Sequence, residues 1–240
     1  MNVLIDRKTI SPGAIYCAGK NFQEHARELR LLEGWGNDSV DPIATREPVI
    51  FMKPGTSLET GGIATIPSFG GTPLSANMHH EVELVLLIGK ESDGCTLEEA
   101  PSLIRGFGAG LDMTLRDLQI AAKKAGEPWL KCKGFRKSAL VSDFVPFDRS
   151  GFPENLEISL QLNGAEVQRG KIADMLFSPA RLVHYLSYIY GLRENDLVFT
   201  GTPAGVGRVV PGDRLEASLS GVKPGREEPE ILARLLAEVV

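Results

Sequence analysis

The chain has 240 residues, enough for one large domain or two small ones, and its hydrophobic (42%) and charged (24%) contents are typical of a soluble globular protein. A net charge of −5 without a basic run argues against nucleic acid as a partner. We expect a cytoplasmic protein, because there is no signal-peptide stretch, no apolar run near the roughly 20 residues of a membrane span, and an odd number of cysteines.

Short apolar runs separated by glycine and proline predict many short strands joined by turns. In chain order, the predicted strands are Ile15–Ala18, Val49–Lys53, Glu81–Ile88, Phe107–Met113, Leu156–Leu162, Leu197–Thr200 and Arg214–Leu219. Asn163-Gly164 predicts a hairpin turn between the fifth of these strands and the residues that follow it.

Three helices are predicted among these strands. The first runs from Asn21 to about Leu32 and carries apolar residues at helical spacing. The second, Thr114–Ala125, has Thr114 as a plausible N-cap and ends before Gly126. The third, Ser178–Ile189, opens with a serine N-cap followed by proline. Together with the strands they predict a β-rich α+β fold in one domain over residues 1–240.

Glu81 and Glu83 lie inside an apolar run that continues to Ile88. Side chains alternate along a strand, so Glu81 and Glu83 point to the same face. Burying two neighbouring carboxylates unpaired is costly, and a hard divalent cation would remove the repulsion between them. The alternative is a solvated strand face with two surface acids.

Asp112 follows another apolar strand and is a candidate third ligand for such a cation. Arg116 and Gln119 follow at intervals of four and three residues, so the three side chains can line one helical face. The alternative is a local salt bridge between Asp112 and Arg116.

Two further groups of residues have both a catalytic and a structural interpretation. Lys133 either stabilises negative charge beside a metal or belongs to a solvated basic turn. His25 and Glu28, three residues apart on the first helix, either form a general base oriented by a carboxylate or make an ordinary surface contact.

A glycine-rich loop follows the predicted strand Leu197–Thr200 and spans Thr200 to Gly207. It contains a proline and lacks the Gly-Lys-Ser/Thr of a P-loop, so it does not predict nucleotide binding. Its backbone N–H groups and threonine hydroxyls either bind a carboxylate or form a plain structural turn.

Taken together, the segments resemble the fumarylacetoacetate hydrolase family, in particular its short branch of acylpyruvate hydrolases and oxaloacetate decarboxylases. The matching segments are Gly19–Phe22 with His25 and Glu28, Glu47–Pro54, His79–Leu84, Leu111–Gln119, Lys123–Trp129, Lys133–Phe135 and Thr200–Gly207. The resemblance implies a mixed β-roll of the fumarylacetoacetase C-terminal-domain type and a homodimer.

The resemblance also implies which residues bind the metal and the substrate. Glu81, Glu83 and Asp112 would hold one divalent cation, Mg²⁺ in the first place and otherwise Mn²⁺ or Ca²⁺. Lys133 would neutralise charge on the substrate oxygens, with Gln119 and Arg116 beside it.

Four further residues receive roles from the resemblance. Thr202 would contact the substrate carboxylate, and Lys53 would lie at the pocket rim or support the metal site. His25 and Glu28 would activate water from a helix that closes over the ligand, within a lid of about residues 21–46. We expect this lid to be the most mobile part of the empty protein.

These roles imply an enzyme that cleaves a carbon–carbon bond in acylpyruvates, with oxaloacetate decarboxylation as a side activity. The same pocket suits an isomerase or decarboxylase of 2-hydroxymuconate-type dienoates. The His25-Glu28 pair favours hydrolysis, because only that reaction needs activated water. An alternative of another class is a catalytically silent dimer that binds 2-oxo acids.

Overall fold

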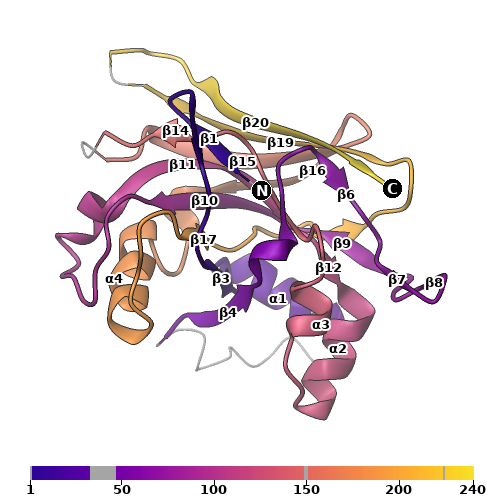
Figure 1. Cartoon of the computed structure of the whole chain (residues 1–240). Helices are drawn as coiled ribbons and strands as arrows, with labels where there is room; N and C mark the ends of the chain where they lie inside the picture. The colour runs from indigo at the N-terminus through magenta and orange to yellow at the C-terminus, as the bar shows by residue number, and fades with distance from the viewer. Residues whose placement is uncertain (1, 33–46, 149–150, 224) are drawn as a thin grey trace.

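Two large β-sheets dominate the computed structural model, which describes residues 2–32, 47–148, 151–223 and 225–240. Figure 1 shows the long strands in the upper part of the view and the four helices gathered below them. Residues 33–46, most of the predicted lid, lie outside the described residues. In the described part of the chain, no helix is long and apolar enough to cross a membrane.

The first large sheet carries the candidate metal ligands. Its strands, in spatial order, are β4 (Val49–Lys53), β3 (Ile15–Gly19), β17 (Leu197–Phe199), β10 (Val82–Ile88), β11 (Ile104–Asp112), β13 (Ala139–Val141) and β5 (Leu58–Glu59), with β14 (Val145–Pro146) also paired to β11. Every residue of the central strand β10 is buried. Leu84 and Leu86 pack into one core cluster, whereas Val85 and Leu87 pack into another. This alternation places Glu83 on the face of Val85, away from the larger core.

The second large sheet covers that larger core. It contains β16 (Ala165–Lys171), β15 (Glu154–Leu162), β19 (Arg214–Val222), β20 (Glu230–Val239) and β6 (Ile63–Ala64). The predicted hairpin at Asn163-Gly164 is confirmed, because β15 and β16 pair antiparallel on either side of it. A register shift after Leu160 pairs Leu160 with Gln168 but Gln161 with Glu166, which forms a β-bulge and turns Gln168 toward the interior.

Three small sheets and three short turns complete the described part of the fold. A three-stranded sheet contains β12 (Thr114–Leu115), β9 (Met78–His80) and β18 (Gly207–Arg208). Two hairpins are formed by β1 (Val3–Ile5) with β2 (Lys8–Ile10) and by β7 (Ser68–Phe69) with β8 (Thr72–Pro73). Short 3₁₀ turns lie at Gly55–Ser57, Ala100–Leu103 and Ile172–Asp174.

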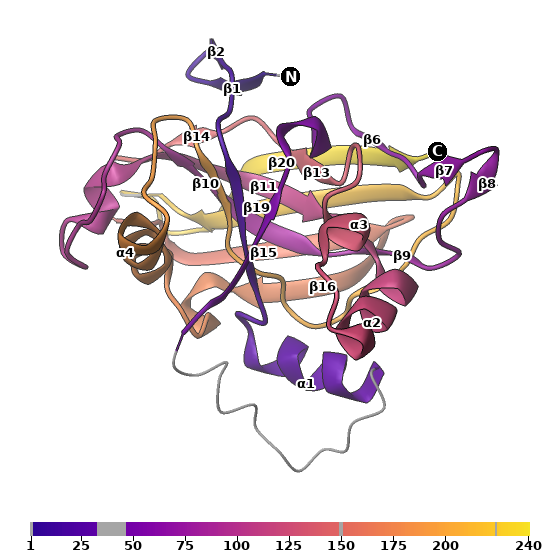
Figure 2. The same ribbon diagram turned by 60° about the horizontal axis from the view of Figure 1, so that its bottom comes forward.

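The helices are α1 (Gln23–Leu32), α2 (Arg116–Ala125), α3 (Leu130–Lys133) and α4 (Pro179–Ile189). Figure 2 shows α1 beside α2, at the end of the molecule opposite the β1–β2 hairpin. The Ser178 N-cap of α4 is confirmed, since its side chain accepts a hydrogen bond from the N–H of Arg181. The predicted Thr114 N-cap of α2 is wrong: Thr114 pairs with His79 in a strand, and the helix begins at Arg116.

Candidate metal centre and active site

Three buried carboxylates converge between the ends of two neighbouring strands. Glu81 lies just before β10, Glu83 lies on β10, and Asp112 is the last residue of β11, where its N–H donates to the carbonyl of Glu81. One oxygen from each carboxylate lies within 4.8 Å of the others. All three side chains are at least 95% buried, so the alternative of a solvated acidic face is wrong.

Three cations surround these carboxylates. Lys133 Nζ lies 2.7 Å from Glu81 Oε2 and 2.6 Å from Asp112 Oδ2. Arg116 donates to Glu81 Oε1 and, at 2.5 Å, to Gln119 Oε1. The predicted alternative of a local Asp112–Arg116 salt bridge therefore does not form, because the guanidinium pairs with Glu81 instead.

Lys53 lies behind the carboxylates rather than at the rim of the cavity. Its Nζ is 2.7 Å from Asp112 Oδ1 and 2.9 Å from Ser138 Oγ, and it also contacts the carbonyls of Met113 (3.4 Å) and Lys133. The side chain is fully buried, which leaves it no contact with a substrate. It supports Asp112 and the end of α3, the second of the two roles expected for it.

The arrangement fits a cation. Burial raises the pKa of Glu83 well above its usual range, and the charges of Asp112 and Glu81 raise it further. Asp112 Oδ1 has Lys53 Nζ at 2.7 Å but no hydrogen bond of good geometry from any described residue, so this oxygen keeps a lone pair for a cation. Oxygen donors of this kind suit Mg²⁺ or Mn²⁺ better than zinc.

Glu81 and Lys133 are both held in their charged forms. Burial alone would raise the pKa of Glu81, but Lys133 and Arg116 hold it well below its usual range. Burial opposes the charge of Lys133, yet Asp112 and Glu81 raise the pKa of its ammonium group above the ordinary value. Lys133 therefore remains a cation at neutral pH, and the alternative of a solvated basic turn is wrong.

Helix α1 brings a histidine to the same cavity. His25 is 3% exposed and its Nδ1 lies 3.0 Å from Glu28 Oε2. Glu28 Oε1 accepts from the N–H of Gly205 at 3.0 Å. Burial would raise the pKa of Glu28, but the hydrogen bonds from His25 and Gly205 lower it. A carboxylate so held fixes the orientation of the imidazole, which agrees better with a catalytic pair than with a surface contact.

The glycine-rich loop serves the site through its backbone as well as its side chains. The N–H of Gly201 donates to Glu83 Oε2 at 2.6 Å, and that of Gly205 reaches Glu28. Gly201 has φ near +100°, and a Cβ there would lie 2.6 Å from Asn21 Cβ. The loop therefore orients two of the protein's own carboxylates, which its sequence did not reveal.

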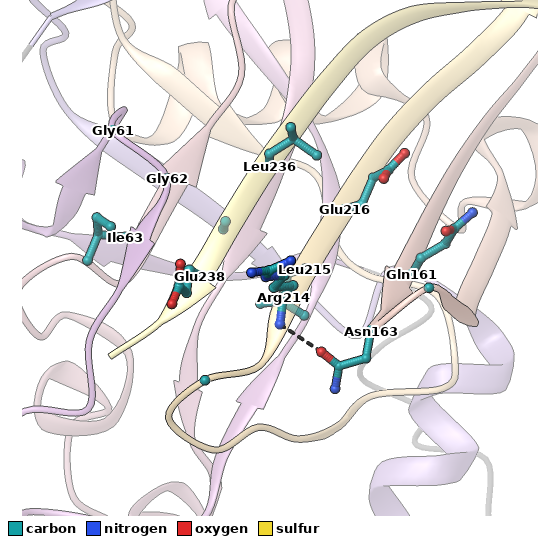
Figure 3. Close-up of a pocket in the computed structure, with 13 residues that line it drawn as sticks. Gly61, Gly62, Ile63, Gln161, Asn163, Arg214, Leu215, Glu216, Leu236 and Glu238 are labelled. Atoms are coloured by element: carbon teal, nitrogen blue, oxygen red, sulfur yellow. Dashed lines mark hydrogen bonds between the residues drawn. The ribbon is translucent and has the colours of Figure 1, made fainter.

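The cavity between these groups has a volume of about 20 Å³, close to that of one water molecule. His25, Leu29, Thr202, Gln119 and the three carboxylates line it, together with the larger side chains of Phe51, Trp129, Lys20 and Lys123. A second cavity of about 840 Å³ lies over β19 and β20 (Figure 3), where Asn163 Oδ1 accepts from the N–H of Arg214. Among the described residues, the only cluster of metal-ligating side chains is the carboxylate one.

Two residues of the site were not predicted from the sequence. Asn21 is buried and hydrogen-bonds the carbonyls of Phe177 and Thr200, which fixes the start of α1. Gln168 is buried against Thr202. Simple alternation along the strand would have placed Val167 inside, and only the bulge reverses this.

Comparison with known proteins agrees with this geometry. The family model described as fumarylacetoacetate (FAA) hydrolase C-terminal matches residues 14–228. The chain is 37% identical over 209 residues to the mitochondrial oxaloacetate tautomerase FAHD1 of Mus musculus, covering 87% of both chains. It is 39% identical to the oxaloacetate tautomerase YcgM of Escherichia coli, covering 86% of this chain and 88% of that protein.

A solved structure shows the same fold with ligands bound. Fumarylpyruvate hydrolase from Pseudomonas aeruginosa, in complex with Mn²⁺ and pyruvate, superposes with a TM-score of 0.80 at 34% identity. The match covers 100% of this chain and 95% of that one. The predicted α+β fold is confirmed by this likeness.

Proposed function

Because this chain belongs to the fumarylacetoacetate hydrolase family, we propose that it is a metal-dependent enzyme that cleaves acylpyruvates into pyruvate and a carboxylic acid. The observation that carries the proposal is that His25, paired with Glu28, lines the same cavity as the three carboxylates and Lys133. A carboxylate cluster alone would serve any reaction of a 2-oxo acid, whereas an oriented imidazole supplies a base.

Glu81, Glu83 and Asp112 would hold the divalent cation, with Mg²⁺ as the proposed ion. When bound, such an ion polarises the keto oxygen of a 2-oxo acid. Lys133 stabilises the negative charge that develops on the substrate oxygen as the carbon–carbon bond breaks. Thr202, which lines the cavity, donates a hydrogen bond to the substrate carboxylate.

His25 takes the proton of a water molecule, and that water attacks the distal carbonyl carbon. Glu28 accepts the Nδ1–H of the imidazole, so the other ring nitrogen is the base. The carbon–carbon bond then breaks, its electron pair remains on the pyruvate fragment, and the hydroxyl stays on the released acid. A proton then returns to the carbon of this fragment, and pyruvate and the carboxylic acid are the products.

Keto–enol conversion of oxaloacetate is the second candidate. It is favoured by the names of the relatives from mouse and E. coli. The same imidazole would move a proton between carbon and oxygen without any water being consumed. Decarboxylation of oxaloacetate needs neither an activated water nor this proton transfer, so it provides a reference reaction.

The test is to assay purified protein with Mg²⁺ against acetylpyruvate and oxaloacetate, with and without a strong chelator. Glu83→Gln should abolish activity with the fold intact, whereas Glu98→Gln, an exposed acid, should leave activity unchanged. Full activity in the presence of the chelator would exclude metal dependence.

His25→Ala separates the two candidate reactions, which both need proton transfer by the imidazole, from oxaloacetate decarboxylation. Acylpyruvate hydrolysis and oxaloacetate tautomerisation should both collapse, while oxaloacetate decarboxylation should change much less. The faster of the first two reactions in the unaltered enzyme identifies the principal one. An equal loss of hydrolysis and decarboxylation would mean that His25 serves binding rather than proton transfer.

A further inference from the structure

The carboxamide of Gln168 uses its full hydrogen-bonding capacity beside the active site. Its Oε1 accepts from the N–H of Val82 (3.1 Å) and lies 2.9 Å from His80 Nδ1. Its Nε2 donates to the carbonyl of Pro203 (2.9 Å) and to Thr202 Oγ1 (2.8 Å). The side chain is 2% exposed, and a buried glutamine is tolerated only when its polar atoms are satisfied in this way.

Two backbone partners fix which way the carboxamide points. The N–H of Val82 can only donate and the carbonyl of Pro203 can only accept, so the oxygen must face Val82 and the nitrogen must face Pro203. A flipped amide would break both hydrogen bonds in a buried place. The direction of the contact to Thr202 follows: Gln168 is the donor and the threonine oxygen is the acceptor.

That direction determines what the Thr202 hydroxyl does. A hydroxyl has one proton to donate, and Gln168 already supplies the other proton at this oxygen. No described residue accepts a hydrogen bond from Thr202 Oγ1, and Thr202 lines the cavity together with Glu83 and Lys133. The free proton is therefore directed to a ligand rather than into the protein.

We infer that Gln168 is a positioning residue that forces Thr202 to act as a hydrogen-bond donor to the carboxylate of a 2-oxo acid. This inference rests on the proposed function, because it needs an anionic ligand in the cavity. The same glutamine holds the loop that supplies the Gly205 N–H to Glu28, since its Nε2 donates to the carbonyl of Pro203 in that loop.

Gln168→Glu reverses the polarity of this contact. A carboxylate at position 168 can only accept from Thr202, so the hydroxyl proton turns away from the cavity. Pyruvate binding to Mn²⁺-loaded protein, measured by calorimetry, should weaken about 10–100-fold, the range expected for a lost hydrogen bond to a charged group. Thr202→Val should weaken binding to a similar extent, and Gln168→Glu combined with it should cause no further loss.

The matched control is Gln161→Glu, which makes the same change at an exposed position on the neighbouring strand β15. Thr202→Ser keeps the hydroxyl and should keep both the affinity and its sensitivity to Gln168→Glu. The Mn²⁺ affinity should not fall in any of these proteins, which separates positioning of Thr202 from general damage to the site.

Three outcomes would overturn the inference. Additive losses in the double variant would mean that Gln168 acts independently of Thr202, and unchanged pyruvate affinity in Gln168→Glu would mean that it does not act on binding. If Gln168→Glu does not fold, Gln168→Met removes the donor without adding charge, and its loss must likewise vanish in the Thr202→Val background. Failure of the unaltered protein to bind pyruvate would instead overturn the proposed function, and the inference with it.

Discussion

Lys133 is the residue on which the electrostatics of the site depend most. Its ammonium group bridges Glu81 and Asp112 from the end of the one-turn helix α3. The backbone carbonyl of Lys133 accepts a hydrogen bond from the ammonium group of Lys53. A flexible side chain is thereby fixed at both ends. Preorganised charge of this kind stabilises developing negative charge without reorganisation during the reaction.

Lys133→Ala should lower turnover about 10²–10³-fold, the typical loss when one preorganised stabilising group is removed. Divalent-ion affinity should not fall, because the change removes a positive charge beside the ligands. Steady-state kinetics and a Mn²⁺ titration on one preparation check both statements. Lys131→Ala, on the exposed face of the same helix α3, is the control. Normal turnover in Lys133→Ala would leave the ion as the sole charge stabiliser.

Glu28 gives the fold a dependence on acidity. Hydrogen bonds from His25 and Gly205 outweigh burial and hold the pKa of Glu28 below its ordinary value of 4.5. A carboxyl with a lowered folded-state pKa contributes stability that is fully present above pH 4.5 and is lost as the pH falls through the folded-state value.

The melting temperatures of the unaltered protein and Glu28→Gln should therefore differ by a constant amount above pH 4.5 and converge below it. Thermal unfolding between neutral pH and strongly acidic pH measures the difference. Glu24→Gln, which alters an exposed acid on the same helix, should show a much smaller difference at every pH. A Glu28→Gln difference that persists unchanged in acid would contradict this account.

Helix α1 is held over the site by contacts at its start, at Asn21, whereas its far end is exposed. Leu32, the last residue of the helix, is 47% exposed, whereas the buried face contains His25 and Leu29. The cavity beneath is too small for a 2-oxo acid, so residues that line it must shift to admit one. Asn21 joins the helix to that loop.

Asn21→Ala should lower the free energy of unfolding by about 1–3 kcal/mol, because it leaves buried backbone groups of Phe177 and Thr200 without partners. Urea denaturation measures the loss. Gln23→Ala, a change at an exposed position two residues away, should have almost no effect. Equal stability of the two variants would show that Asn21 is not the anchor of α1.

Elements with a strong local pattern were predictable from the sequence. The seven predicted strands are all present, because their apolar runs match buried positions in the two sheets. Strand β20 was missed, since Leu-Ala-Arg-Leu-Leu-Ala-Glu consists of good helix formers and pairing with β19 overrides that preference. The site residues were predicted from sequence motifs. No motif reveals that Glu28 accepts a hydrogen bond from the N–H of Gly205, 177 positions away.

The whole molecule has a core that both large sheets share. One cluster contains Leu84 and Leu86 of β10 together with Leu215 of β19 and Leu235 of β20. The two sheets therefore bury the same apolar surface. Such sharing supports the expectation that residues 1–240 form one domain, which remains a prediction.

Leu235→Ala should cost about 2–5 kcal/mol of unfolding free energy and shift the whole transition, because it opens a space in this shared core. Leu236→Ala, the next residue on β20 and 60% exposed, should change stability by about 0.5 kcal/mol or less. Circular dichroism and tryptophan fluorescence should report one coincident transition. Two separate transitions would indicate two folding units.

The bulge in β16 links the length of a surface turn to the active site. Because side chains alternate along a strand, a regular ladder continued from the pairs Leu162–Ala165 and Gln161–Glu166 would set Val167 opposite Leu160 and turn Gln168 to the outer face. No residue lining the cavity would have changed, yet the partner of Thr202 would be gone. Deletion of Ala165 should instead be tolerated, because Glu166 would then pair with Leu162, Val167 with Gln161, and Gln168 still with Leu160, without the bulge.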